Sequence, residues 1–316
     1  CSRILTTFEE NAVYLSMEQA SYIAAQVING LQLGAVYALI ALGYTMVYGI
    51  LRLINFAHGD IFMLGAFVAY FLISRFGMPL YLVFFATMAV TALSGYLMEK
   101  IAYKPLRNAP RISLLITAVG VSLFLEYFCS LRSIFTPDYI GFPRPFEMET
   151  YNFSPGGFEF SFTNVQALIF AITFSALVLL YLLVYRTKQG RAMRAVSYDQ
   201  ETAALMGINI DNTVSLTFMV GAALAGMGGV LYGIAYPQIN VFMGIMPGIK
   251  SFIAAVLGGI GIIHGAVIGG LIVGVSEVIV SAFLSSTYRD GVIFVILLIV
   301  LLVKPSGIFG KRIDKV

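Results

Sequence analysis

Long apolar runs alternate with short polar segments along most of the chain. Because an α-helix rises about 1.5 Å per residue, roughly 20 apolar residues cross a bilayer core about 30 Å thick. The pattern predicts an all-α polytopic membrane protein with about eight transmembrane helices, within a range of roughly seven to nine. The runs cover residues 21–51, 76–98, 112–131, 161–185, 213–236 and 291–303, with a glycine-rich stretch over 250–284.

One further apolar run, over residues 61–74, is too short to cross a bilayer alone. To span the membrane, its helix must begin near Asn55 and take His58 and Asp60 with it. Polar side chains inside a span are candidates for function. Asn55 and Asp60 have an alternative, structural role, because either could cap the start of a helix at the interface or bond to a neighbouring helix.

Glycines interrupt the apolar stretch over 250–284, most densely around Gly258, Gly259 and Gly261. This composition predicts a broken or re-entrant helix pair. Irregular backbone at membrane depth is tolerated only where protein or a water-filled cavity surrounds it. The number of crossings depends on whether this pair dips into the membrane or crosses it twice.

Cations gather in three segments, 99–111, 186–212 and 304–316, and acidic residues predominate over 132–163. Lys and Arg in short loops mark the cytoplasmic side. The chain is therefore expected to begin outside and end inside, although Arg52 leaves the parity of the crossings open. The expected organisation is one transmembrane domain over 21–310, preceded by a disordered or upstream tail (1–20) and followed by a cytoplasmic tail (311–316).

Composition agrees with a protein that lies in the bilayer. Only 11% of residues are charged, against about 25% in soluble proteins. A net charge of +3 spread over loops gives no support for nucleic-acid binding. The two cysteines, Cys1 and Cys129, are far apart and indicate no disulfide framework or metal site. No phosphate-binding motif of the form GxxxxGK[ST] occurs, so neither ATP hydrolysis nor a cofactor is expected.

The polar segment 186–212 is the largest in the second half of the chain. Small apolar residues recur at helical spacing over 191–206, and Gly207 is typical of a residue that ends a helix. The pattern predicts a short helix on the membrane surface that offers small side chains to another protein. The alternative is an ordinary cytoplasmic loop.

Several segments together resemble LivH-type permeases, the membrane subunits of branched-chain amino acid ABC importers. They are GAVYALIALGYTMVYGILRLINFAHGDIFMLGAF (34–67), AYKPLR (102–107), GRAMRAVSYDQETAALMGINID (190–211), KSFIAAVLGGIGIIHGAVIGG (250–270) and KPSGIFG (304–310). The resemblance covers nearly everything from about residue 20 to 310. It implies a bacterial inner-membrane permease domain that moves branched-chain amino acids inward. The implied partners are a LivM-like second permease, two LivG/LivF-like ATPases and a periplasmic amino-acid-binding protein.

The resemblance also implies that 186–212 is a cytoplasmic coupling loop. Glu201-Thr202-Ala203-Ala204, with Gly207 three residues on, is similar to the EAA…G pattern that fits a groove on the ATPase. Thr202 departs from this pattern because it separates the acid from the alanines. Small residues let a helix sit deep against a partner, and charged neighbours can fix it there. The residues expected to couple to the ATPase are Arg191, Arg194, Glu201, Ala203, Ala204 and Gly207.

Seven polar residues in or beside the spans are candidates for the pathway or its gate: Asn55, His58, Asp60, Glu126, Lys250, His264 and Glu277. Each has a structural alternative. Glu126 could bond a tyrosine or the second permease, and Lys250 could extend to the outer surface. His264 could be a turn residue, and Glu277 a contact between helices. None of these residues has the spacing of metal ligands or of a nucleophile and its base.

Rival functions follow from the same residues. An ion-coupled secondary transporter or a channel acting alone could use intramembrane carboxylates and a broken helix, but would not require a surface helix with small side chains. An intramembrane enzyme would need a catalytic set that the sequence lacks. Relatives that carry urea or short amides leave the substrate of an ABC permease open.

Overall fold

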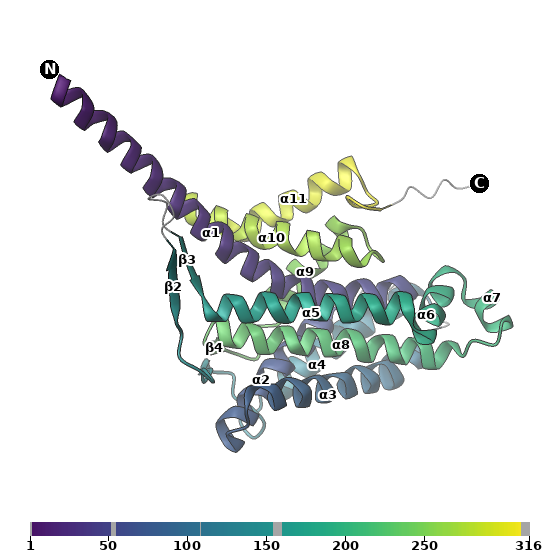
Figure 1. Cartoon of the computed structure of the whole chain (residues 1–316). Helices are drawn as coiled ribbons and strands as arrows, with labels where there is room; N and C mark the ends of the chain where they lie inside the picture. The colour runs from purple at the N-terminus through teal and green to yellow at the C-terminus, as the bar shows by residue number, and fades with distance from the viewer. Residues whose placement is uncertain (1, 52–54, 108, 154–159, 311–316) are drawn as a thin grey trace.

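The computed structural model describes residues 2–51, 55–107, 109–153 and 160–310, and these are mostly helical (Figure 1). The helices are α1 (Ser2–Leu51), α2 (His58–Phe76), α3 (Leu80–Met98), η1 (Glu99–Tyr103), η2 (Lys104–Leu106), α4 (Arg111–Cys129), α5 (Asn164–Arg186), α6 (Lys188–Tyr198), α7 (Gln200–Leu205), α8 (Ile210–Ala235), α9 (Ile245–Gly258), α10 (Ile263–Phe283) and α11 (Arg289–Val303). The strands are β1 (Ile140–Gly141), β2 (Thr150–Phe153), β3 (Phe160–Thr163) and β4 (Gln238–Ile239).

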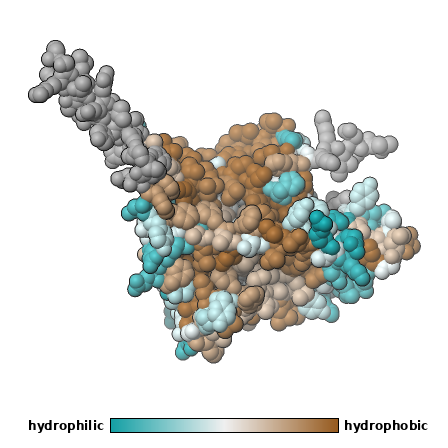
Figure 2. All heavy atoms as spheres, in the orientation of Figure 1, coloured by the Kyte–Doolittle hydropathy of each residue, from teal (hydrophilic) through white to brown (hydrophobic). Residues whose placement is uncertain are grey.

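Within the described ranges, seven helices are long and apolar enough to cross a membrane: α1, α2, α3 with its η1–η2 extension, α4, α5, α8 and α10. This confirms the all-α polytopic membrane fold. Helices α1 and α8 are the most buried of the seven, whereas α3, α4 and α5 present large apolar side chains such as Phe85, Phe124 and Phe174 outward. Figure 2 shows the resulting apolar belt, with hydrophilic residues gathered at its two ends.

The two polar ends carry different structures. Strands β2 and β3 form an antiparallel hairpin, and β1 pairs with β4. These strands lie at the opposite end of the bundle from α6 and α7 (Figure 1). The acidic connection 132–163 and the cationic segment 186–212 are therefore at opposite ends, as their charges predict. The span expected from residue 161 begins at Asn164, because Thr163 and Gln166 form a capping box there.

Glycines bring the buried helices together. A Cβ added at Gly34 of α1 would lie 2.7 Å from the Leu271 Cα of α10, so the two backbones are in direct contact. Helix α9 ends at Gly258, and α10 begins at Ile263 after a turn in which Gly259 and Gly261 have φ of 105° and 89°. Only glycine adopts such angles without strain. The broken glycine-rich helix pair is thus confirmed, and α9 is too short to span the bilayer by itself.

Replacing Gly258 with alanine is expected to separate α9 from α10. The added Cβ would lie 1.9 Å from the Gly265 carbonyl oxygen, so a backbone must shift, and overpacking of this kind costs about 1–3 kcal/mol or more. Thermal unfolding of the detergent-solubilised protein measures the loss. Gly120→Ala in α4 is the control, because nothing lies within 4 Å of its added Cβ. Equal stability of the two variants would contradict this packing.

Two boundaries differ from expectation. The segment 1–20, expected to be a disordered or upstream tail, belongs to α1 from Ser2 onward; its separation from the transmembrane domain stays a prediction. The second span begins at His58, with Asn55 buried just before it. Ala57 precedes that helix and no side chain caps its start, so the capping role considered for Asn55 and Asp60 is wrong. The cytoplasmic tail 311–316 lies outside the described residues.

Candidate functional site

The cationic segment forms two short helices where the sequence predicted one over 191–206. Asp199 separates α6 from α7, because it is extended (φ −152°, ψ 115°) and caps α7. Its Oδ1 accepts hydrogen bonds from the backbone N–H groups of Glu201 (2.9 Å) and Thr202 (3.2 Å). The Thr202 side chain and these N–H groups lower the pKa of the Asp199 carboxyl. The cap is therefore ionised at neutral pH and fixes the start of α7.

Gly207 ends this unit, as the sequence predicts. Its φ of 82° is left-handed, and its N–H donates to the Ala204 carbonyl (2.9 Å). The short helix α7 is thus defined at both ends and projects at one end of the bundle (Figure 1).

Large apolar side chains are exposed beside polar ones at the end of α7. Leu205 is 87% exposed and Met206 79% exposed, and Tyr198 at the end of α6 is 90% exposed. Of the predicted coupling residues, Glu201, Ala204 and Gly207 are exposed, whereas Ala203 is buried against the bundle. Sequence reasoning missed Tyr198 and Leu205, although an apolar residue in a polar loop is itself a signal for a binding surface.

Arg194 holds α6 in place. The Arg194 Nη1 donates to the Val184 carbonyl (2.9 Å), and its guanidinium lies 5.0 Å from the centre of the Tyr185 ring. Arg194 therefore fixes α6 against the end of α5, while Arg191 is exposed. Contact of either residue with an ATPase stays a prediction.

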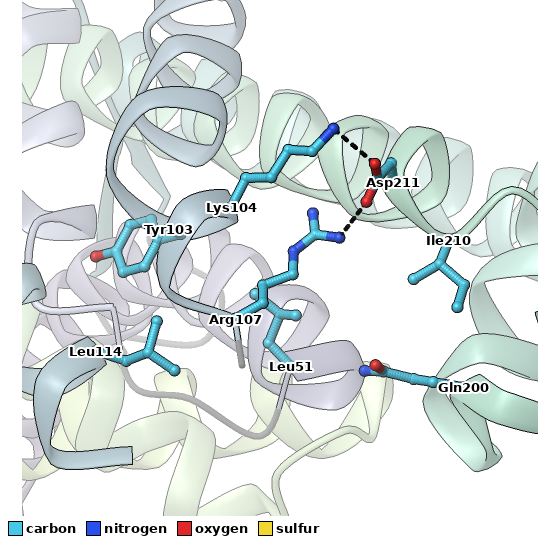
Figure 3. A pocket seen from close by; sticks show the side chains of 8 residues that line it. All are labelled: Leu51, Tyr103, Lys104, Arg107, Leu114, Gln200, Ile210 and Asp211. Atoms are coloured by element: carbon cyan, nitrogen blue, oxygen red, sulfur yellow. Dashed lines mark hydrogen bonds and ion pairs between the residues drawn. The ribbon is translucent and has the colours of Figure 1, made fainter. Parts of the chain in front are cut away.

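A cavity of about 480 Å³ lies between the ends of α1, η1–η2, α4, α7 and α8 (Figure 3). Two cations reach across it to the start of α8. The Lys104 Nζ lies 2.6 Å from the Asp211 Oδ2, and the Arg107 Nη1 lies 2.6 Å from the Asp211 Oδ1. On the other side, Gln200 Nε2 donates to the Ile50 carbonyl (3.0 Å). The projecting helix α7 is thereby tied to α1, and the start of α8 to η2.

Glu99 anchors this network inside the bundle. Its buried carboxylate pairs with Arg107 and accepts a hydrogen bond from the Ser215 hydroxyl (2.6 Å). From the sequence, Lys104 and Arg107 were predicted only to be part of the cationic segment 99–111 on the cytoplasmic side. Their partners are distant in the chain, so no local pattern could have found them.

Replacing Arg107 with methionine is expected to destabilise the protein by about 2 kcal/mol, because the buried Glu99 carboxylate loses a charged hydrogen-bond partner. Lys104→Met is the matched control. Lys104 and Asp211 are both nearly half exposed, and exposed ion pairs contribute about 0–1 kcal/mol. Thermal unfolding of the two purified variants gives the comparison. A loss in Lys104→Met that equals the loss in Arg107→Met would show that Glu99 does not depend on its partner.

The first group of intramembrane candidates joins helices. Asn55 Oδ1 accepts a hydrogen bond from the Tyr103 hydroxyl (2.6 Å). The Asp60 carboxylate accepts one from the Ser122 hydroxyl of α4 (2.5 Å), and the Glu126 carboxyl of the same helix lies close to it. The structure thus brings Asp60 and Glu126 together, which the sequence did not predict.

The two candidate histidines, His58 in α2 and His264 in α10, lie in different surroundings. His58 is buried, with its ring edge-to-face against Tyr44 at 4.6 Å between centroids. His264 is exposed in the first turn of α10, and its ring packs against that of Phe309 at 5.5 Å between centroids.

The second group forms a buried ionic cluster. The Lys250 Nζ lies 2.6 Å from the Glu277 Oε1 and 2.7 Å from the Asp290 Oδ1, and the Tyr37 hydroxyl donates to the Glu277 Oε2 (2.8 Å). The side chains of Lys250 and Glu277 are 4% and 6% exposed. The interpretation that Lys250 extends to the outer surface is therefore wrong. Glu277 of α10 contacts Tyr37 of α1 and Lys250 of α9, so it does form the contact between helices that was considered as its structural role.

Comparison with known proteins gives consistent matches over nearly the whole chain. A family model described as the branched-chain amino acid transport system permease component matches residues 26–301. The chain is 44% identical to the high-affinity branched-chain amino acid transport system permease protein LivH of Salmonella typhimurium, over 95% of this chain and 99% of that protein. It is 42% identical, with the same coverage, to LivH of Escherichia coli K12. It is 41% identical to the permease protein BraD of Pseudomonas aeruginosa, over 95% of this chain and 100% of that protein.

Proposed function

Because the chain belongs to the family of branched-chain amino acid transport permeases, we propose that it is a membrane subunit of an ABC importer in the bacterial inner membrane. It carries branched-chain or similar small neutral amino acids inward. A LivM-like second permease completes the path, two LivG/LivF-like ATPases hydrolyse ATP, and a periplasmic binding protein delivers the substrate. Seven apolar helices and relatives of nearly equal length support this reading.

The observation that carries the proposal is a pair of exposed apolar side chains, Leu205 at the end of α7 and Met206 directly after it. A transporter that works alone has no use for two exposed apolar side chains on a rigidly capped helix at one polar end. An ATPase groove would bury them, and the exposed side chains of Glu201 in α7 and Arg191 in α6 would add ion pairs at the rim. Ala204 keeps that face of α7 small enough for close approach.

Movement of α7 would be transmitted to the membrane-spanning helices through the contacts around the cavity of about 480 Å³. Gln200 links α7 to the end of α1 through the Ile50 carbonyl, and Asp211 links α8 to Lys104 and Arg107. Helices α1 and α8 are the most buried spans, so a shift transmitted to them alters the centre of the bundle. Glycine contacts between α1 and α10 allow those helices to repack without large side-chain changes.

The test is purification of the chain from its native membrane, followed by reconstitution into proteoliposomes with the binding protein. Two ATPases and a second permease should co-purify, and leucine uptake should require ATP. Uptake by the chain alone, driven by an ion gradient, would replace this proposal with a secondary transporter. ATP-dependent uptake of urea or short amides, without leucine uptake, would keep the ABC permease and change its substrate.

A further inference from the structure

A second cavity, of about 220 Å³, opens between α1, α10 and the start of α11. Leu33, Tyr236, Glu277, Val278, Ser281 and Arg289 are among the residues that line it. Tyr236 ends α8 immediately before β4, so the cavity lies toward the strand-bearing end of the bundle, which is the expected outer side. Its deepest charged group is the buried Glu277.

The charges at this cavity balance one another. Lys250 and Arg289 supply two cations, and Glu277 and Asp290 supply two carboxylates, all within 4 Å of a partner. Lys250 is enclosed, but Arg289 is 48% exposed. Because the cluster is neutral, a neutral zwitterion can enter without leaving a net charge in a low-dielectric site, whereas an isolated anion or cation cannot.

Arg289 is only partly engaged. Its Nε lies 3.8 Å from the Glu277 Oε1 and 3.5 Å from the Asp290 Oδ1, distances longer than a hydrogen bond between charged groups. Among the described residues, the other two guanidinium nitrogens have no closer acceptor. Those nitrogens can pair with a carboxylate through two parallel N–H···O bonds.

We propose that this cavity binds the α-carboxylate and α-ammonium groups of a small neutral amino acid as it enters from outside. The proposal rests on the importer function and adds a location to it. Arg289 receives the carboxylate. Glu277, whose oxygens each retain a free lone pair beside their present bonds, and the Tyr236 hydroxyl receive the ammonium group. Leu33 and Val278 give the aliphatic side chain an apolar wall.

Protection of an introduced cysteine tests the site. Ser281→Cys in the full complex, in right-side-out vesicles, should react with a membrane-impermeant maleimide, and millimolar leucine should slow the reaction. Isoamylamine, which lacks the carboxylate, and isocaproate, which lacks the ammonium group, should not. Ser133→Cys in the exposed strand-side connection is the control whose labelling leucine leaves unchanged.

Adding Arg289→Gln to Ser281→Cys should raise the half-protecting leucine concentration about tenfold or more, because one bidentate charged pair is lost. Arg289→Lys keeps the charge but loses the paired geometry, and should fall between. Arg75→Gln, an exposed arginine at the end of α2, should change nothing. If Arg289→Gln does not assemble, the three ligands compared on Ser281→Cys alone still decide the matter.

Leucine uptake in the same vesicles separates the two proposals. Normal uptake without protection, equal protection by all three ligands, or no labelling of Ser281→Cys would overturn the binding site and leave the importer intact. Absence of ATP-dependent leucine uptake by the unmodified complex would instead overturn the importer function on which the site depends.

Discussion

Replacing both Leu205 and Met206 with aspartate is expected to lower ATP-dependent uptake by more than about tenfold, because two apolar anchors of a docking surface are lost and each typically contributes more than about 1.4 kcal/mol. Both side chains are almost fully exposed in the isolated chain, so their replacement removes little internal packing. The fold and the yield of solubilised protein should therefore stay unchanged. Loss of the ATPases from the purified complex would be the direct readout.

Tyr139→Asp is the matched control for added charge. Tyr139 is 73% exposed and lies in the connection at the opposite end of the bundle, so the ATPases should remain bound. Leu205→Met with Met206→Leu keeps the surface apolar and should retain uptake. If the aspartate variant still co-purifies with both ATPases and transports leucine, α7 is not the docking element.

A larger side chain on α7 gives an independent prediction. Ala204→Trp should uncouple ATP hydrolysis from uptake, because Ala204 is exposed on α7 and a large ring would hold the partner away. Simultaneous measurement of ATPase rate and uptake is the check. Wild-type uptake in this variant would remove Ala204 from the contact.

Most of the fold could be predicted from the pattern of hydrophobic residues. The apolar runs located the seven spans, although the run over 291–303 forms the helix α11, which at 15 residues is not one of them. The glycines at 258–261 located the break between α9 and α10. Both signals are local, since length and backbone freedom are properties of adjacent residues. The break at Asp199 was missed although Asp is a common helix cap, because the apolar stripe continues across it.

The charged networks could not be predicted in the same way. Lys250 and Glu277 were recognised as unusual, but their association with Tyr37 and Asp290 arises only when α1, α9, α10 and α11 are packed. Glu99, Arg107 and Asp211 likewise meet from two segments far apart in the chain. A sequence can show that a buried charge needs a partner, but it does not show which distant residue is that partner.

Replacing Lys250 with methionine is expected to destabilise the protein by about 3–5 kcal/mol, the usual result of removing one partner from a buried ion pair. Glu277 would keep only the Tyr37 hydrogen bond and the more distant Arg289. Thermal unfolding of the solubilised chain measures the effect. Lys188→Met, an exposed cation at the start of α6, should change stability by no more than about 0.5 kcal/mol.

The double variant Lys250→Met with Glu277→Gln separates stability from transport. Buried ion pairs can often be replaced by uncharged residues without loss of stability, so this variant should recover much of what Lys250→Met loses. Uptake should not recover with it, because Glu277 also receives the substrate ammonium group. Recovery of both properties would make the cluster purely structural, and failure to recover either would mean that Asp290 and Arg289 depend on the pair for their own placement.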